Sequence, residues 1–136
     1  MKYNYSVTFP FDPSRPAFRR PLVEVTIFGS RDDSIKTMAL IDSGADYSLF
    51  NIEFANKLGI DLSVAEHQIT TGVEGGHKDL LILDIEMQVE ALGKIKIPVG
   101  FINSPSVSGL LGQIGFFDLN RIKFERDHNV FEIIPR

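Results

Sequence analysis

The stretch "ALIDSGADYSLF", residues 39–50, places an acid, a hydroxyl and a glycine at the end of an apolar run. An aspartate that follows a core strand costs folding free energy unless it is paired, hydrogen-bonded or used in chemistry. The simplest interpretation of Asp42-Ser43-Gly44 is a strand that ends in a turn of small polar residues. Apolar chain on both sides of this turn, and a second glycine strand "GLLG" at residues 109–112, favour a chemical role for Asp42.

A single carboxylate at this position needs a second one beside it to carry out acid–base chemistry. Two close carboxyl groups share one proton and their pKa values separate, so that one activates water while the other protonates the substrate. The chain contains no second Asp-Ser/Thr-Gly, and its other candidates lie in different contexts: Asp32, Asp33, Asp46 and Asp118. We therefore predict that Asp42 of a second subunit supplies the partner, in a homodimer with one active site on its two-fold axis.

The residues around this stretch predict a mainly β chain with one or two short helices. Residues 22–28 and 35–41 are β-rich runs that bracket "GSRDDS", which is typical of a hairpin. The run "NIEFANKLGI", residues 51–60, has the spacing of one short helix, with Gly59 as a left-handed stop. Further hairpins are predicted to turn at residues 71–76, 92–93 and 127–129, with a short turn or helix at 113–118.

The N-terminal segment has a different character. Residues 3–9 alternate in the two-residue period of a half-buried strand. Residues 10–21 then bring four prolines and three arginines, which predict an extended arm without regular pairing. Such an arm is either a surface connection or a segment that binds a partner.

Composition limits the classes of function. With 136 residues the chain has the size of one domain, residues 1–136, and its net charge of −4 gives no support to nucleic-acid binding. The absence of cysteine excludes disulfides, thiolate metal sites and a cysteine nucleophile. The N-terminus has no apolar signal core and no run has the length of a membrane span, so we expect a cytoplasmic protein with peptides or proteins as partners and no membrane association.

Three other chemical readings of the sequence are weaker. "GLLGQIG" carries spaced glycines, but no Lys-Ser/Thr follows, so a phosphate-binding loop is not indicated. His67, His77 and His128 are scattered without ligand-like pairing, which argues against a zinc site. "DSGA" lacks the Gly-x-Ser-x-Gly elbow of a serine hydrolase.

Taken together, "LIDSGADYSLF" and "GLLG" resemble the two signatures of retropepsin-like aspartic proteases. The order and separation of the motifs match that family over roughly residues 22–134. The resemblance implies a closed, mainly antiparallel β-barrel-like fold that dimerises and binds an extended peptide under two glycine-rich flaps. It implies peptide-bond hydrolysis with no cofactor, and a pH optimum below neutral because the two acids must share a proton.

The resemblance also implies roles for individual positions. Asp42 would be the catalytic acid, Ser43 would make interlocking hydrogen bonds between the two loops, and Gly44 would allow close approach of substrate. Asp46 matches an acid that contacts the substrate main chain. The remaining substrate-binding positions implied by the resemblance are Ala45, the flap residues Gly72, Val73, Glu74 and Gly75, and the subsite residues Leu110 and Leu111.

The chain departs from the viral members of that family in three places. Gln113-Ile114 follows the second motif where viral members commonly have an arginine, so Asp46 lacks its usual cationic partner. Ser43 stands where threonine is common, and the proline-rich N-terminus has no viral counterpart. The first departure supports an alternative function, a retropepsin-like dimerisation or peptide-binding module with little or no turnover.

Overall fold

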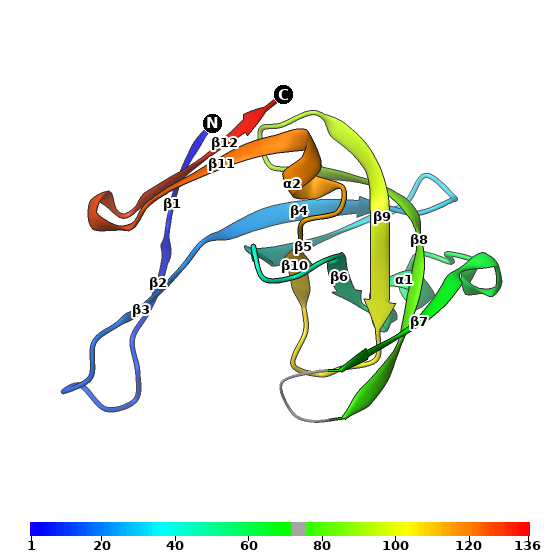
Figure 1. The fold of residues 1–136 in the computed structure, drawn as a ribbon, viewed down its shortest axis with the longest axis horizontal. Coiled ribbons are helices and arrows are strands. Elements are labelled where there is room, and N and C mark those ends of the chain that lie inside the picture. Colours follow the sequence, from blue (N-terminus) through cyan, green and yellow to red (C-terminus); the bar gives the residue numbers. More distant parts are fainter. Residues whose placement is uncertain (72–75) are drawn as a thin grey trace.

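The computed structural model describes residues 1–71 and 76–136 as a mainly β fold (Figure 1). Its strands are β1 (Lys2–Asn4), β2 (Ser6–Thr8), β3 (Phe18–Arg20), β4 (Leu22–Phe28), β5 (Ser34–Ile41), β6 (Ser48–Asn51), β7 (Glu66–Thr71), β8 (His77–Val89), β9 (Lys94–Ile102), β10 (Gly109–Leu111), β11 (Asn120–Glu125) and β12 (Val130–Pro135). Its helices are α1 (Ile52–Lys57), the 3₁₀ turns η1 (Leu62–Val64) and η2 (Arg126–His128), and α2 (Phe116–Leu119). The predicted fold class, mainly β with short helices, is confirmed.

The largest sheet has seven strands in the order β4-β5-β10-β6-β9-β8-β7. An additional antiparallel pairing between β4 and β8 joins the two ends, so that six of these strands form a ring. Two pairings in the ring are parallel, β10 with β5 and β6 with β9, and the other four are antiparallel, so the sheet is mixed but mainly antiparallel, as expected. The first parallel pairing places the end of β10 beside the end of β5, directly before Asp42.

The core fills the inside of this ring. In β4 every second residue is buried, which is the period expected for a strand with one face in the core. Ile27, Met87 and Phe101 come from three different strands and are fully buried. Phe50, Leu111 and Phe116 are also fully buried, so the apolar residues around the Asp42 stretch pack into the same core.

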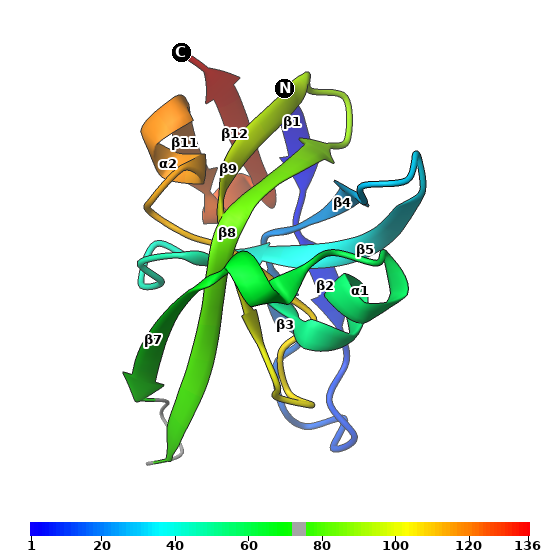
Figure 2. The same cartoon turned by 90° about the vertical axis from the view of Figure 1, so that its right-hand side faces the viewer.

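The two termini lie side by side in a separate three-stranded sheet of order β1-β12-β11 (Figures 1 and 2). The Tyr3 ring stacks on Phe131, with ring centroids 5.4 Å apart. The Met1 ammonium donates to the Ile133 carbonyl at 2.9 Å. Within the described part of the chain, no helix combines the length and the apolarity that crossing a membrane requires.

The hairpins and the first helix agree with the sequence analysis. β4 and β5 pair across the predicted "GSRDDS" turn, and the turns at 92–93 and 127–129 connect β8 with β9 and β11 with β12. After α1, Gly59 has a φ of 63°, the left-handed conformation predicted for the helix stop. α2 starts three residues later than the predicted turn or helix at 113–118.

The prediction for the N-terminal arm is wrong in one respect. β3 pairs with β2 in a two-stranded hairpin, so residues 18–20 are paired although the sequence suggested no regular pairing in 10–21. The four prolines lie before or after Phe18–Arg20 and leave the backbone N–H groups of that segment free to pair. The predicted strand 3–9 is divided at Tyr5, whose N–H donates to the Asn129 carbonyl at 3.1 Å.

Candidate active site

The candidate active site is built on the turn between β5 and β6, residues 42–47. β5 ends with Ile41, which is buried, and the next residue, Asp42, is half-buried at the mouth of the turn. Ser43 and Gly44 are exposed. The sequence therefore places a carboxylate where a core strand reaches the surface, as the apolar run before it predicts.

The Asp42 carboxylate is held by its own turn. The Gly44 N–H donates to Asp42 Oδ1 at 2.9 Å, and the Ala45 N–H donates to the Asp42 carbonyl at 3.2 Å. A Cβ at residue 44 would lie 3.2 Å from Asp42 Oδ1, closer than most side-chain contacts. Glycine at this position lets the backbone approach and orient the carboxylate.

The segment after β10 ties the Asp42 turn down along its whole length. The Asp42 N–H donates to the Leu111 carbonyl at 2.9 Å. The N–H groups of Gln113 and Ile114 donate to the carbonyls of Ala45 and Asp46, at 2.9 and 2.7 Å respectively. These bonds between two segments about 70 residues apart in the chain fix the turn as part of the folded core rather than as a loose loop.

Gly112 and Ser48 are in contact in the buried region below the Asp42 turn. The Gly112 N–H donates to Ser48 Oγ at 3.1 Å, and both residues are buried. A Cβ at residue 112 would lie 2.5 Å from the Tyr47 carbonyl oxygen and 2.7 Å from the Ala45 carbonyl oxygen. Only glycine allows the two segments to come this close.

A hollow of about 380 Å³ opens beside the Asp42 turn. Ala45 and Asp46, both predicted to bind substrate, lie on its wall with Gly44. Its other lining residues come from β6, β7 and β8 and the end of the turn, and sequence reasoning did not identify them: Tyr47, Leu49, Gln68, Ile69, Thr70 and Leu80. Gln68 and Leu80 face each other in the β7–β8 pair, so the register of that hairpin brings them to the site.

Two predicted subsite residues differ in their burial. Leu110 is half-buried, whereas Leu111 has no exposed surface and belongs to the hydrophobic core. Direct contact of Leu111 with a substrate does not fit this placement, because in a strand neighbouring side chains point to opposite faces. Leu111 supports the Asp42 turn from the core, through its carbonyl and its packing.

The predicted flap lies largely outside the described residues. Gly72, Val73, Glu74 and Gly75 belong to the segment 72–75, which the structure does not describe. The strands on either side, β7 and β8, pair antiparallel from Glu66–Ile82 to Thr71–His77. The strand pair expected to carry a flap is therefore in place, and the four flap positions stay predictions.

Gln113 replaces the missing arginine with a different interaction. Its side-chain Nε2 donates to the Ser43 carbonyl at 2.8 Å, and its backbone N–H donates to Ala45. Within residues 1–71 and 76–136, none of the ion pairs includes Asp46. Gln113 thus holds the turn through a carbonyl, and the Asp46 carboxylate stays exposed beside the hollow.

In the described part of the chain, no cluster of three or more His, Cys, Asp or Glu side chains could hold a metal ion.

The other aspartates considered in the sequence lie in turns and caps. Asp32 has a φ of 58° in the β4–β5 turn, and Asp118 Oδ2 accepts from the Gly115 N–H at 3.0 Å.

Two solved structures that match this fold are retropepsin-like. A retropepsin-like aspartic protease from Rickettsia conorii matches with a TM-score of 0.58 and 16% sequence identity, over 83% of this chain and 96% of that one. The retroviral protease-like domain of Ddi1 from Leishmania major matches with a TM-score of 0.56 and 16% identity, over 82% of this chain and 87% of that one. The chain therefore has the retropepsin-like fold, as its two motifs predicted.

Comparison of the sequence alone gives no such link. No protein-family model matches the chain. No curated protein matches it either. At 16% identity the likeness to the two solved structures lies in the fold, and the activity has to be argued from the site.

Proposed function

We propose that the chain is an aspartic endopeptidase that hydrolyses peptide bonds as a homodimer. The observation that carries this proposal is the Asp42-Ser43-Gly44 turn, which holds an accessible carboxylate beside a hollow on a retropepsin-like fold. One chain supplies one such turn, so two chains related by a two-fold axis supply the pair of acids. The homodimer, the flap and a cytoplasmic location belong to this proposal.

The proposed reaction needs no cofactor. A water molecule held between the two Asp42 carboxyl groups loses a proton to the ionised one and attacks the peptide carbonyl carbon. The protonated carboxyl donates its proton to the carbonyl oxygen. Collapse of the tetrahedral intermediate breaks the C–N bond, and a carboxyl proton passes to the leaving nitrogen. Activity then requires one shared proton, so it decreases as rising pH removes that proton.

The proposed substrate is an extended peptide. Ala45, Leu49 and Leu80 give the hollow apolar surface, whereas Asp46 and Gln68 offer an acceptor and an amide. A peptide main chain in extended form presents alternating N–H and C=O groups that such polar residues can bind, while its side chains enter apolar pockets. In this proposal Ser43, exposed in the single chain, hydrogen-bonds across the two-fold axis.

Cleavage of a random peptide mixture, followed by mass spectrometry across a pH range, tests this function. The wild type is expected to cut peptides below neutral pH, and Asp42→Asn to lose at least about 10³-fold in rate, because asparagine cannot accept the proton of the water. Asp84→Asn, an exposed position on β8, is the matched control and keeps the wild-type rate. Equal rates for the wild type and Asp42→Asn contradict the mechanism.

Gln113 stands where an arginine would pair with Asp46, and this difference supports a second candidate function, a peptide-binding module without turnover. Peptides that bind the wild-type protein and are recovered uncut at every pH favour the module.

A further inference from the structure

The β2–β3 hairpin, residues 6–20, leaves the body of the molecule as a projecting arm (Figures 1 and 2). Its two strands pair only with each other, and all three residues of β3 are exposed. A two-stranded hairpin of this kind is marginally stable in water by itself. Contact with another surface would therefore stabilise the arm.

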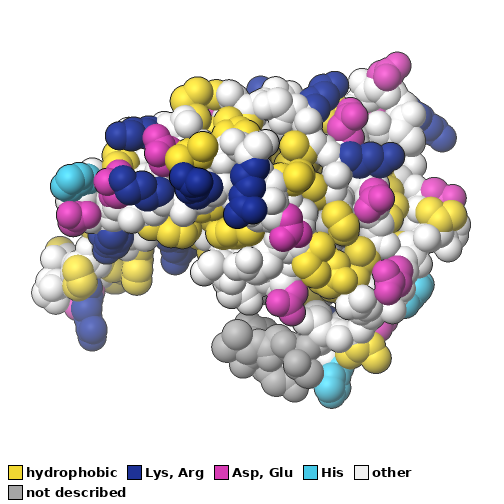
Figure 3. All heavy atoms as spheres, turned by 45° about the horizontal axis from the view of Figure 1, so that its top comes forward, with side chains coloured by type: hydrophobic (Ala, Val, Ile, Leu, Met, Phe, Trp, Pro, Cys, Tyr) yellow, Lys and Arg dark blue, Asp and Glu magenta, His cyan; other side chains and the backbone are white. Residues whose placement is uncertain are grey.

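The arm carries exposed apolar side chains at unusual density. Phe9 is 81% exposed, Phe11 is 107% exposed and Phe18 is 52% exposed. The projecting lobe at the lower left of Figure 3 shows hydrophobic side chains next to Lys or Arg side chains. Large aromatic side chains are the residue type that contributes most when an interface forms.

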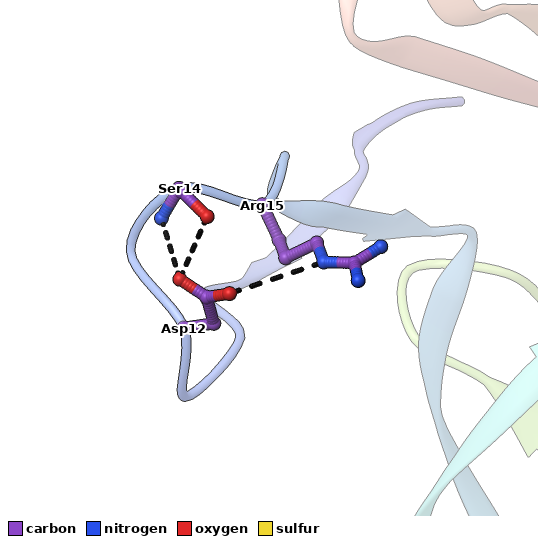
Figure 4. A network of polar contacts seen from close by, with 3 residues as sticks. All are labelled: Asp12, Ser14 and Arg15. Atoms are coloured by element: carbon purple, nitrogen blue, oxygen red, sulfur yellow. Dashed lines mark hydrogen bonds and ion pairs between the residues drawn. The ribbon is translucent and has the colours of Figure 1, made fainter.

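The arm is held in a defined shape at its tip. Asp12 Oδ1 accepts hydrogen bonds from the Ser14 N–H at 3.0 Å and from Ser14 Oγ at 2.8 Å (Figure 4). Asp12 Oδ2 lies 3.9 Å from Arg15 Nε, and the Arg15 N–H donates to the Asp12 carbonyl at 3.1 Å. A tip that is already shaped loses less conformational entropy when it binds.

The base of the arm is anchored beside the Asp42 turn. The Ile41 N–H, one residue before Asp42, donates to the carbonyl of Pro21, the residue that follows β3, at 3.0 Å. Arg19 Nη1 also donates to Asn129 Oδ1 at 2.6 Å, which links β3 to the turn between β11 and β12. Figures 1 and 2 show the rest of the arm extending away from the ring of strands.

Charge also favours a second copy as the occupant. Residues 6–20 contain three arginines and one aspartate, a net charge of +2, which leaves −6 on the rest of the chain. A basic arm and an acidic body are complementary between two copies of the same chain.

We propose that the β2–β3 hairpin is a dimerisation arm whose Phe9, Phe11 and Phe18 pack against the body of a second copy of this chain. The proposal rests on the homodimer of the proposed function and names the segment that holds it together. Because the base of the arm is bonded to Ile41, directly before Asp42, the arm begins close to the place where the two Asp42 turns meet in the proposed dimer.

Sedimentation velocity over a concentration series tests the arm. The double variant Phe9→Ser with Phe11→Ser is expected to raise the dimer dissociation constant at least about tenfold, because two aromatic anchors are lost. Val64→Ser is the matched control, a valine on η1 that is 73% exposed and lies outside the arm, and it leaves the constant unchanged. High salt is expected to weaken the wild-type dimer as well, because it screens the charge complementarity.

Folding of the variants is checked by circular dichroism and cooperative unfolding. The single variant Phe11→Ser serves as the second test, because a fully exposed side chain contributes little to the folded monomer. The proposal that the arm holds the dimer is contradicted if the wild type stays monomeric at every concentration, or if the variants dimerise as tightly as the wild type. Binding of the wild type to phosphatidylserine vesicles that needs Phe9 and Phe11, with an unchanged dimer constant, also overturns it.

The outcomes separate this proposal from the catalytic one. Arm-dependent dimers that cut no peptide support the arm and contradict the endopeptidase. Peptide cleavage by dimers that form equally well in Phe9→Ser with Phe11→Ser supports the endopeptidase and contradicts the arm.

Discussion

At Gly112 a methyl group would overlap two backbone carbonyl oxygens, of Ala45 and Tyr47, that belong to the Asp42 turn. The Ser48 hydroxyl accepts from the Gly112 N–H in the same buried place. Backbone groups thus hold much of the Asp42 turn, and the side chains of Ser48 and Gln113 add a hydrogen bond each. The sequence motif "GLLG" marked the glycine, but the partners that make it necessary lie more than 60 residues away.

Gly112→Ala is expected to lower the free energy of unfolding by about 1–3 kcal/mol, because the two segments must move apart in a packed region. Gly93→Ala is the matched control, since a Cβ at residue 93 meets no atom within 4 Å. Chemical denaturation of both variants measures the difference. Equal stability of Gly112→Ala and Gly93→Ala would show that the space between Gly112 and the carbonyls of Ala45 and Tyr47 accepts a methyl group.

At the scale of elements, β1 pairs with β12, and Tyr3 adds a contact of its ring and a hydrogen bond of its hydroxyl. The Tyr3 hydroxyl donates to the Glu90 carbonyl at 2.6 Å, and the Tyr3 ring stacks on Phe131. Burial, and secondarily the negative charge of Glu90, raise the pKa of the Tyr3 phenol above its usual value of 10.0. The alternation of residues 3–9 indicated a strand here, but not which partner strand each half would choose.

Tyr3→Phe is expected to cost about 0.5–1 kcal/mol of stability near neutral pH, because the hydrogen bond to Glu90 is lost. A raised pKa means that the stabilisation is complete below pH 10.0 and disappears as the pH rises through the folded-state pKa. The difference between wild type and variant should therefore shrink in alkaline solution. Urea denaturation at neutral and alkaline pH measures it, and a difference that stays constant contradicts the assigned role.

The prolines of the arm show where element-level prediction failed. Four prolines suggested an unpaired segment, yet they leave a proline-free stretch, Phe18–Arg20, just long enough to pair with β2. The positions of the prolines show which residues lack a backbone N–H group. They do not show whether a neighbouring strand is available to pair with the residues that have one.

At the scale of the whole molecule, the proposed activity belongs to two chains. Mixing wild type with an equal amount of Asp42→Asn is expected to leave about half of the activity per wild-type chain after exchange, because mixed dimers carry one intact acid. Peptide cleavage measured before and after exchange tests this. Activity per wild-type chain that stays unchanged at every ratio would mean that a single chain cuts alone.

The sequence by itself determined the mainly β class, the Asp42-Ser43-Gly44 turn and its downstream glycine partner, since these depend on local apolar patterning and on glycine. It could not determine the ring closed by β4 and β8, or the lining residues from β7 and β8, because register between distant strands sets both. Only the tertiary structure showed that Gln113 binds the Ser43 carbonyl, that Leu111 is buried and that the base of the β2–β3 arm lies beside Asp42. Such contacts depend on which residues the fold brings together in space, and not on which residues are neighbours in the sequence.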